Sequence, residues 1–279
     1  MIKPAKISVV LSLVLTMILV IAGCGTAAKD HTDSQAADKS TPTSAAAKTV
    51  ELTVSAAASM TDALKEIQED YKTKNPNITL NFNFGASGAL QQQIEQGAPA
   101  DLFLSAAAKN MEVLVDKQLI DANQQKNVLN NELVAVVSAD GEVPVASFAD
   151  LSKSEIKNIA IGIPESVPAG SYAKEALTKT NLWDSLQSKI VQGKDVRQVL
   201  QYVATGNADV GFVYKTDALT SDKVKIAFAV DPATYTPVEY PIGIVKATKH
   251  RKEAEDFYTY LQTQEALDVF VKYGFSVLN

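Results

Sequence analysis

Two stretches of the sequence carry the same local pattern: Gly97-Ala98-Pro99-Ala100-Asp101-Leu102-Phe103-Leu104-Ser105 and Gly206-Asn207-Ala208-Asp209-Val210-Gly211-Phe212-Val213-Tyr214. In each stretch a glycine ends a predicted helix, a turn leads to an aspartate, and a short apolar strand ends in a hydroxyl residue. The pattern has two interpretations. It is either a chance recurrence of short α/β units, or the sign of two similar lobes whose strand ends face one cleft, where open α/β sheets bind ligands.

Predicted strands and helices alternate on both sides of these stretches. Apolar or alternating runs predict strands at residues 50–54, 78–84, 101–105, 133–137, 159–163, 210–213, 224–228 and 238–245. Amphipathic periodicity predicts helices at residues 60–72, 90–96, 110–117, 172–180, 196–205, 252–262 and 265–273. This alternation indicates an α/β fold with a mostly parallel sheet that is covered by helices.

The amino-terminal residues have the features of a bacterial lipoprotein signal. Lys3 and Lys6 precede an apolar run over residues 7–22, which is short for a spanning helix of about 20 residues. Small residues directly precede Cys24, the only cysteine in the chain. We therefore expect residues 1–23 to be a signal peptide and Cys24 to carry lipid, the alternative being a plain membrane anchor. Residues 24–48 are small and polar, which predicts a disordered tether.

The composition excludes several classes of protein. Of 26 basic residues, Lys3 and Lys6 leave with the signal, so 24 remain against 32 acidic residues and the formal charge is −8. Nucleic acids recruit basic patches, so we expect no nucleic-acid partner. The folded part, residues 49–279, is long enough for two lobes and is expected to be a monomer.

The sequence offers no residue set for catalysis. His31 lies in the tether and His250 lies among basic residues, so a zinc site and a base for a serine nucleophile are both missing. The stretch Gly85-Ala86-Ser87-Gly88-Ala89 misses the nucleophile-elbow pattern at its last position. We therefore expect no enzyme, no cofactor and no bare metal cation. A secreted hydrolase remains as the alternative from another class.

Small or hydroxyl-containing turns open several predicted helices. Ser59 stands at a helix start with Asp62 three residues on, as in a capping box. Similar turns occur at residues 84–90, 167–172 and 193–197. Each turn is either an ordinary cap or part of an anion site, because converging helix N-termini bind anions without any cation.

Five stretches together resemble the molybdate-binding proteins of bacterial ABC importers. They are Ala57-Ala58-Ser59-Met60-Thr61-Asp62-Ala63-Leu64, Phe84-Gly85-Ala86-Ser87-Gly88, Gln93-Ile94-Glu95-Gln96-Gly97-Ala98-Pro99-Ala100-Asp101-Leu102-Phe103, Val167-Pro168-Ala169-Gly170 and Gly211-Phe212-Val213-Tyr214. The resemblance implies a periplasmic-binding-protein fold, with two α/β lobes, two crossover segments and a ligand cleft between the lobes. We expect crossings at residues 132–138 and 237–245. Lobe 1 would then hold residues 49–131 and 246–279, and lobe 2 residues 132–245.

The same resemblance implies a site for molybdate or tungstate made of neutral hydrogen-bond donors. These donors are the hydroxyl and N–H groups of Ser59 and Ser87, the N–H groups of Ala169 and Val196, and the phenol of Tyr214. Molybdenum would be bound only as the oxyanion. The absence of a carboxylate argues against phosphate, which carries a proton at neutral pH, whereas sulfate or thiosulfate is the open alternative.

The resulting expectation is an extracytoplasmic binding lipoprotein. It would be held by the lipid on Cys24 to the outer face of the cell membrane and would deliver its ligand to an ABC permease. A single-membrane cell surface and a periplasm both fit.

Overall fold

The computed structural model describes residues 49–141 and 144–278, and all of them belong to one compact unit. The expected signal peptide (residues 1–23), Cys24 and the tether to residue 48, with His31, lie outside the described residues. In the part of the chain that is described, no helix is both long and apolar enough to cross a membrane.

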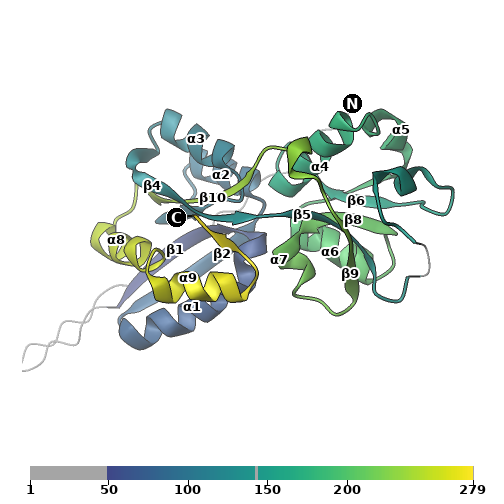
Figure 1. Cartoon of the computed structure of the whole chain (residues 1–279). Helices are drawn as coiled ribbons and strands as arrows, with labels where there is room; N and C mark the ends of the chain where they lie inside the picture. Colours follow the sequence, from purple (N-terminus) through teal and green to yellow (C-terminus); the bar gives the residue numbers. More distant parts are fainter. Residues whose placement is uncertain (1–48, 142–143, 279) are drawn as a thin grey trace, which may run out of the picture. The chain divides into compact units, whose positions relative to one another are not determined.

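The first lobe is built on a six-stranded sheet with the strand order β11-β4-β10-β3-β1-β2 (Figure 1). Its strands are β1 (Val50–Ala57), β2 (Ile78–Gly85), β3 (Leu102–Leu104), β4 (Ile120–Asn131), β10 (Val238–Val245) and β11 (Ser276–Val277). Its helices are η1 (Ala58–Met60), α1 (Thr61–Lys74), α2 (Ser87–Glu95), α3 (Ala108–Asp116), α8 (Arg251–Tyr260) and α9 (Gln264–Lys272). The strands β2 and β3 run parallel to β1, so the carboxyl ends of all three meet at one edge of the sheet.

The second lobe is built on a five-stranded sheet with the strand order β7-β6-β8-β5-β9. Its strands are β5 (Leu133–Ser138), β6 (Ile159–Gly162), β7 (Ile190–Gly193), β8 (Val210–Tyr214) and β9 (Val224–Ala229). Its helices are η2 (Phe148–Ser152), α4 (Pro168–Lys179), α5 (Trp183–Leu186), η3 (Gln187–Lys189), α6 (Val196–Ala204), α7 (Lys215–Ala218) and η4 (Pro232–Thr234). Strands β6, β7 and β8 are parallel, which again gathers their carboxyl ends at one edge.

Both sheets are more mixed than the expected parallel arrangement. Strand β10 pairs antiparallel with β3 and β4, and β5 pairs antiparallel with β8 and β9. These antiparallel strands are the ones that carry the chain from one lobe to the other. Alternating strands and helices predict parallel pairing because a helix carries the chain back between two parallel strands. Where the chain passes from one sheet into the other, no such helix is needed, and the strand can pair antiparallel.

The first crossing begins where the sequence placed it, whereas the second precedes its expected range of residues 237–245. The first lies at Glu132, between β4 and β5, and the second lies between β9 and β10. The sequence assigned residues 238–245 to lobe 2. In the structure they form β10, which is hydrogen bonded within the first sheet.

The repeated stretches have the same structure in both lobes. Gly97 and Gly206 adopt left-handed backbone conformations, with φ of 85° and 72°, which a glycine reaches at no steric cost. The Oδ2 atom of Asp101 accepts a 2.7 Å hydrogen bond from the Thr53 N–H, and the Oδ2 of Asp209 accepts one of 2.7 Å from the Lys157 N–H. Each aspartate thus ties its turn to the neighbouring chain segment, which favours two similar lobes over chance.

Candidate functional site

A small cavity lies between residues of the two lobes. Its lining combines seven first-lobe and five second-lobe residues: Ala57, Ala58, Ser59, Gly85, Ala86, Ser87, Ala106, Val167, Pro168, Ala169, Val196 and Tyr214. None of these described residues carries a charged side chain. The volume of the cavity is far below the roughly 300–1,000 Å³ of sites for larger organic ligands.

All five residues expected to bind the ligand line this cavity: Ser59, Ser87, Ala169, Val196 and Tyr214. They come from segments up to 155 residues apart, between Ser59 and Tyr214. The fold therefore brings the expected set together, and the role of each residue as a ligand donor stays a prediction.

Strand register places the two serines side by side. Strands β1 and β2 are parallel, and Ala57 pairs with Gly85 at their carboxyl ends. Ser59 and Ser87 each follow that pair by two residues. Both side chains are buried, with 3% and 1% exposure. The carboxyl edge of parallel strands is where open α/β sheets bind ligands, and here it carries two hydroxyl groups.

Three helices of nine or more residues begin at the cavity. Ser87 is the first residue of α2, Pro168 and Ala169 open α4, and Val196 opens α6. The N–H groups of a helix's first turn have no acceptor within the helix, and the N-terminus carries a partial positive charge. Three such ends around one cavity give it an affinity for anions without a cation.

Local sequence fixes two of these helix starts. Proline suits the first position of a helix because its missing N–H would be unpaired there, and Pro168 occupies that position in α4. The Asp195 carboxylate caps α6 by accepting a 2.8 Å hydrogen bond from the Gln198 N–H. The helix α6 packs through one apolar face, which leaves its N-terminus at the cavity. The buried residues of this face are Val196, Val199, Leu200 and Val203.

Tyr214 contributes a hydroxyl group with no hydrogen-bond partner in the described part of the chain. It ends β8, pairs with Leu133 at the first crossing, and is 1% exposed. Burial raises the pKa of Tyr214 well above its usual value, so the phenol keeps its proton and can donate it. A buried unpaired hydroxyl costs about 1–3 kcal/mol, which a ligand acceptor in the cavity would offset.

The two serines do not cap helices as the sequence suggested. Ser59 lies inside η1, α1 begins after Met60 without a side-chain cap, and Asp62 pairs with Arg197 instead. The Ser59 Oγ and the Tyr240 hydroxyl are 2.8 Å apart. The Ser87 Oγ accepts a 2.9 Å hydrogen bond from the Ala106 N–H. The capping-box interpretation of Ser59 and Asp62 is therefore wrong.

The lobes also contact each other directly beside the cavity. The Gly88 N–H donates a 2.9 Å hydrogen bond to the Ser166 carbonyl oxygen. Arg197 Nη2 in the second lobe lies 2.7 Å from Asp62 Oδ2 in the first, while its Nε lies 2.7 Å from Asp217 Oδ1 within the second lobe. With contacts across the cleft at both positions, the cavity is closed in this structure.

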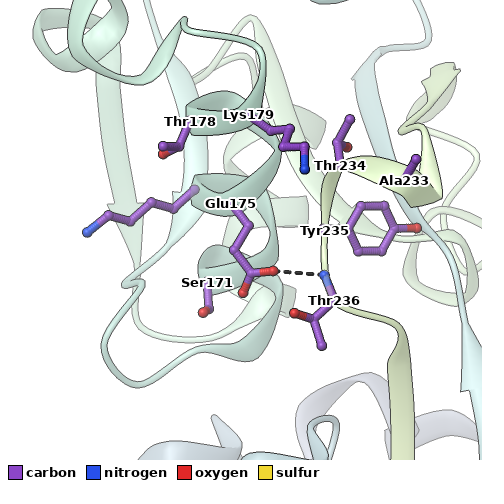
Figure 2. Close-up of a pocket in the computed structure, with 9 residues that line it drawn as sticks. Ser171, Glu175, Thr178, Lys179, Ala233, Thr234, Tyr235 and Thr236 are labelled. Carbon is purple, nitrogen blue, oxygen red and sulfur yellow. Dashed lines mark hydrogen bonds between the residues drawn. The ribbon is translucent and has the colours of Figure 1, made fainter.

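A second hollow belongs to the second lobe alone. Figure 2 shows it between α4 and the segment that contains η4, where Glu175 accepts a 2.8 Å hydrogen bond from the Thr236 N–H. Its lining includes the exposed residues Thr178 and Lys179. None of the five expected donors lines it.

Sequence reasoning missed the groups that support the site. Tyr240, Asn131 and Gly88 lie next to the lining, and the Ala106 N–H holds Ser87. A buried tyrosine within the apolar stretch Val238–Val245 was the one available signal. In the described residues, histidine, cysteine and acidic side chains form no group of three that could hold a metal ion.

Comparison with known proteins gives consistent matches over nearly the whole folded part. The family of bacterial extracellular solute-binding proteins matches residues 52–276. A Bacillus subtilis protein named as an ABC transporter substrate-binding lipoprotein, YvgL, is 53% identical over 262 residues, 94% of this chain and 95% of that protein. The molybdate-binding protein ModA of Haemophilus influenzae is 41% identical over 236 residues, 82% of this chain and 91% of that protein.

Solved structures agree in architecture. A substrate-binding domain described as part of a molybdenum ABC transporter from Clostridium difficile is 44% identical, with a TM-score of 0.64. The match covers 83% of this chain and 100% of that chain. These likenesses confirm the two-lobed periplasmic-binding-protein fold expected from the sequence.

Proposed function

This chain belongs to the bacterial extracellular solute-binding proteins, which are not enzymes, and on that premise we propose that it captures molybdate or tungstate and delivers it to an ABC importer. The named relatives that bind molybdate support this ligand class. The ligand itself would be a tetrahedral dianion that offers only acceptor atoms.

The observation that carries the proposal is a closed, uncharged cavity lined by donors. Burying a dianion is costly unless several donors point at it, and hydrogen bonds to a charged acceptor are the strong kind. The cavity supplies three helix N-termini, two serine hydroxyls and the unpartnered hydroxyl of Tyr214. Donors from both lobes make ligand binding and lobe closure one event.

The proposed site must distinguish among oxyanions. Sulfate, like molybdate, is a tetrahedral dianion, so the size of the anion is the remaining basis for rejecting sulfate. Phosphate retains a proton at neutral pH and needs an acceptor, and the described lining contains no carboxylate. We therefore propose molybdate and tungstate as ligands, with sulfate and thiosulfate as the competitors that the experiment must exclude.

We further propose that the protein acts as a monomer on the outer face of the cell membrane, held by lipid on Cys24. The lipoprotein named among its relatives supports the anchor. Replacing Cys24 by alanine should move the protein from the membrane fraction to the soluble fraction. Retention of the Cys24→Ala protein in the membrane fraction would argue for a membrane anchor instead.

Isothermal titration calorimetry tests the ligand. The protein from residue 49 onward is titrated separately with molybdate, tungstate, sulfate, thiosulfate and phosphate. We expect one-to-one binding of molybdate and tungstate and no measurable binding of the other three anions. Equal binding of sulfate or thiosulfate would overturn the proposed ligand and keep the binding function. Silence from all five anions, on protein shown to be folded, would overturn the oxyanion site.

A further inference from the structure

We infer that Tyr240 and Asn131 are positioning residues that set the Ser59 hydroxyl as a hydrogen-bond donor to the cavity. The inference rests on the proposed function, because it concerns how the same site meets an oxyanion. Neither residue lines the cavity, and both act through Ser59.

The direction of the hydrogen bonds is fixed from a backbone group. The Glu132 N–H can only donate, and it donates to the Asn131 Oδ1 at 2.9 Å. This contact determines which side of the amide carries the NH₂ group. The Asn131 Nδ2 then donates to the Thr216 Oγ1 at 2.9 Å and to the Tyr240 hydroxyl oxygen at 3.2 Å.

Tyr240 in turn donates a hydrogen bond to Ser59. The Asn131 Nδ2 can only donate, so the Ser59 Oγ, 2.8 Å away, is the acceptor that remains for the Tyr240 proton. Tyr240 is fully buried, and burial raises its pKa well above the usual value, so the proton stays on the phenol. The ambiguity in the Ser59–Tyr240 contact is thereby resolved, with Tyr240 as the donor.

The Ser59 proton is left to face the cavity. The Ser59 Oγ receives a hydrogen bond from Tyr240, and its proton has no acceptor among the hydrogen bonds of the described residues. Ser87 is set in the same way, because its Oγ accepts from the Ala106 N–H. Both serine hydroxyls therefore accept a hydrogen bond from the protein, but only Ser59 accepts it from a side chain.

This arrangement has a consequence for selectivity. A serine hydroxyl can donate or accept, and an unconstrained one would adapt to an anion that carries a proton. Here each hydroxyl oxygen already accepts one hydrogen bond, and neither hydroxyl proton has an acceptor among the hydrogen bonds of the described residues. The pair Asn131–Glu132 stands at the first crossing, and Tyr240 stands in the first strand after the second crossing. Residues at both connections between the lobes therefore act on the Ser59 hydroxyl.

The hydrogen bonds from Asn131 through Tyr240 to Ser59, called the relay below, can be tested by a double-mutant cycle. The dissociation constant for molybdate is measured by calorimetry on the protein from residue 49 onward. Four proteins are compared: the wild type, Tyr240→Phe, Ser59→Ala and the double variant. We expect Tyr240→Phe to weaken binding roughly fivefold when Ser59 is present, the effect of one neutral hydrogen bond. In the Ser59→Ala background the same change should weaken binding less than about twofold, because the relay then has no end group.

Tyr235→Phe is the matched control. Tyr235 is a buried tyrosine near the second crossing whose hydroxyl accepts from the Leu133 N–H at 3.2 Å, without contact to Ser59. Its removal should leave affinity within about twofold of the wild type. Thermal unfolding of every variant without ligand checks that each remains folded.

The outcomes separate the relay from the proposed function. An equal loss of affinity in both backgrounds, or no loss in either, would overturn the relay while wild-type binding upholds the ligand. If the wild type ignores molybdate and tungstate but binds sulfate or thiosulfate, the proposed ligand fails and the cycle is run with the anion that binds. A wild type that binds none of these anions overturns both.

Discussion

The Gly88 N–H donates a 2.9 Å hydrogen bond to the Ser166 carbonyl oxygen, and the two residues belong to different lobes. The contact leaves no room for a side chain. A Cβ atom on Gly88 would lie 2.7 Å from the Ser166 oxygen and 2.9 Å from its Cα. Both are backbone atoms, which cannot move aside without moving the lobe. Glycine at position 88 therefore allows closure.

Gly88→Ala should hold the lobes apart without unfolding either. Crowding a packed contact costs about 1–3 kcal/mol, so the dissociation constant for the ligand should rise roughly 5- to 150-fold. Calorimetry with molybdate measures the loss, and thermal unfolding without ligand should change little. Unchanged affinity in Gly88→Ala would contradict the closure argument.

Tyr214→Phe should separate binding from stability. The phenol has no partner among the described residues, so its removal should leave the stability of the ligand-free protein unchanged or raised. Loss of a charge-assisted hydrogen bond of about 1.5–3 kcal/mol should weaken ligand binding roughly 10- to 100-fold.

Tyr71→Phe is the matched control for Tyr214. The Tyr71 hydroxyl is also buried and unpartnered in the described structure, but its ring packs on Phe257 in the first lobe, 4.9 Å between centroids. Its removal should leave affinity unchanged. A loss of affinity for Tyr71→Phe as large as that for Tyr214→Phe would show that general loosening, not a donor, is being measured.

The ion pair between Asp62 and Arg197 should matter little. Their side chains are 37% and 26% exposed, and exposed pairs contribute about 0.2–1 kcal/mol. Asp62→Asn should therefore weaken binding no more than about fivefold, and less at high salt. Asp256→Asn, which breaks the Lys252–Asp256 pair within α8, is the control. A loss above about tenfold for Asp62→Asn would make this pair a principal closing contact.

Asp217 should make stability depend on pH. Burial raises its pKa to about 6, against the opposing charge of Arg197. The folded state therefore binds the proton more tightly than the unfolded state does. The stabilisation is present below the usual value of 3.8 and is lost as the pH rises to about 6. The loss is on the order of 3 kcal/mol.

Urea unfolding at about pH 4 and pH 7 measures this effect. Asp217→Asn should remove the part of the pH dependence that Asp217 causes. Asp150→Asn is the contrasting variant, because Lys153 and the Ala146 N–H lower the pKa of Asp150 to about 2. The contribution of Asp150 is lost only as the pH falls toward 2, so its removal should change little between pH 4 and 7. Identical pH profiles for the wild type and Asp217→Asn would contradict the assignment.

The sequence predicted the elements whose pattern is local. The apolar strands β5 and β8 and the amphipathic helix α6 lie within one or two residues of their expected bounds. Strand β4 was missed because its sequence, Ile120–Asn131, is mostly polar. Its strand conformation comes from pairing with β10, more than a hundred residues later, and no local pattern reports such a partner.

The same distinction applies to the site. The lining residues Ser59 and Ser87 were predicted from the resemblance to a known family, which short stretches of sequence are enough to carry. The partner of Ser59 was not predicted, since Tyr240 lies 181 residues away. Asp62 was assigned to a helix cap for the same reason, because nothing nearby in the sequence indicates Arg197.

The position of β10 between β4 and β3 sets the order in which the chain can fold. The five-stranded sheet is made of consecutive residues and is complete once Ala229 is available. The six-stranded sheet stays divided until residues 238–245 arrive, since β10 is the only described strand that joins β4 to β3. The lobe that begins first along the chain is thus finished last. While the chain is being synthesised, its amino-terminal third therefore lacks the central strand of its sheet until a segment near the other end is available.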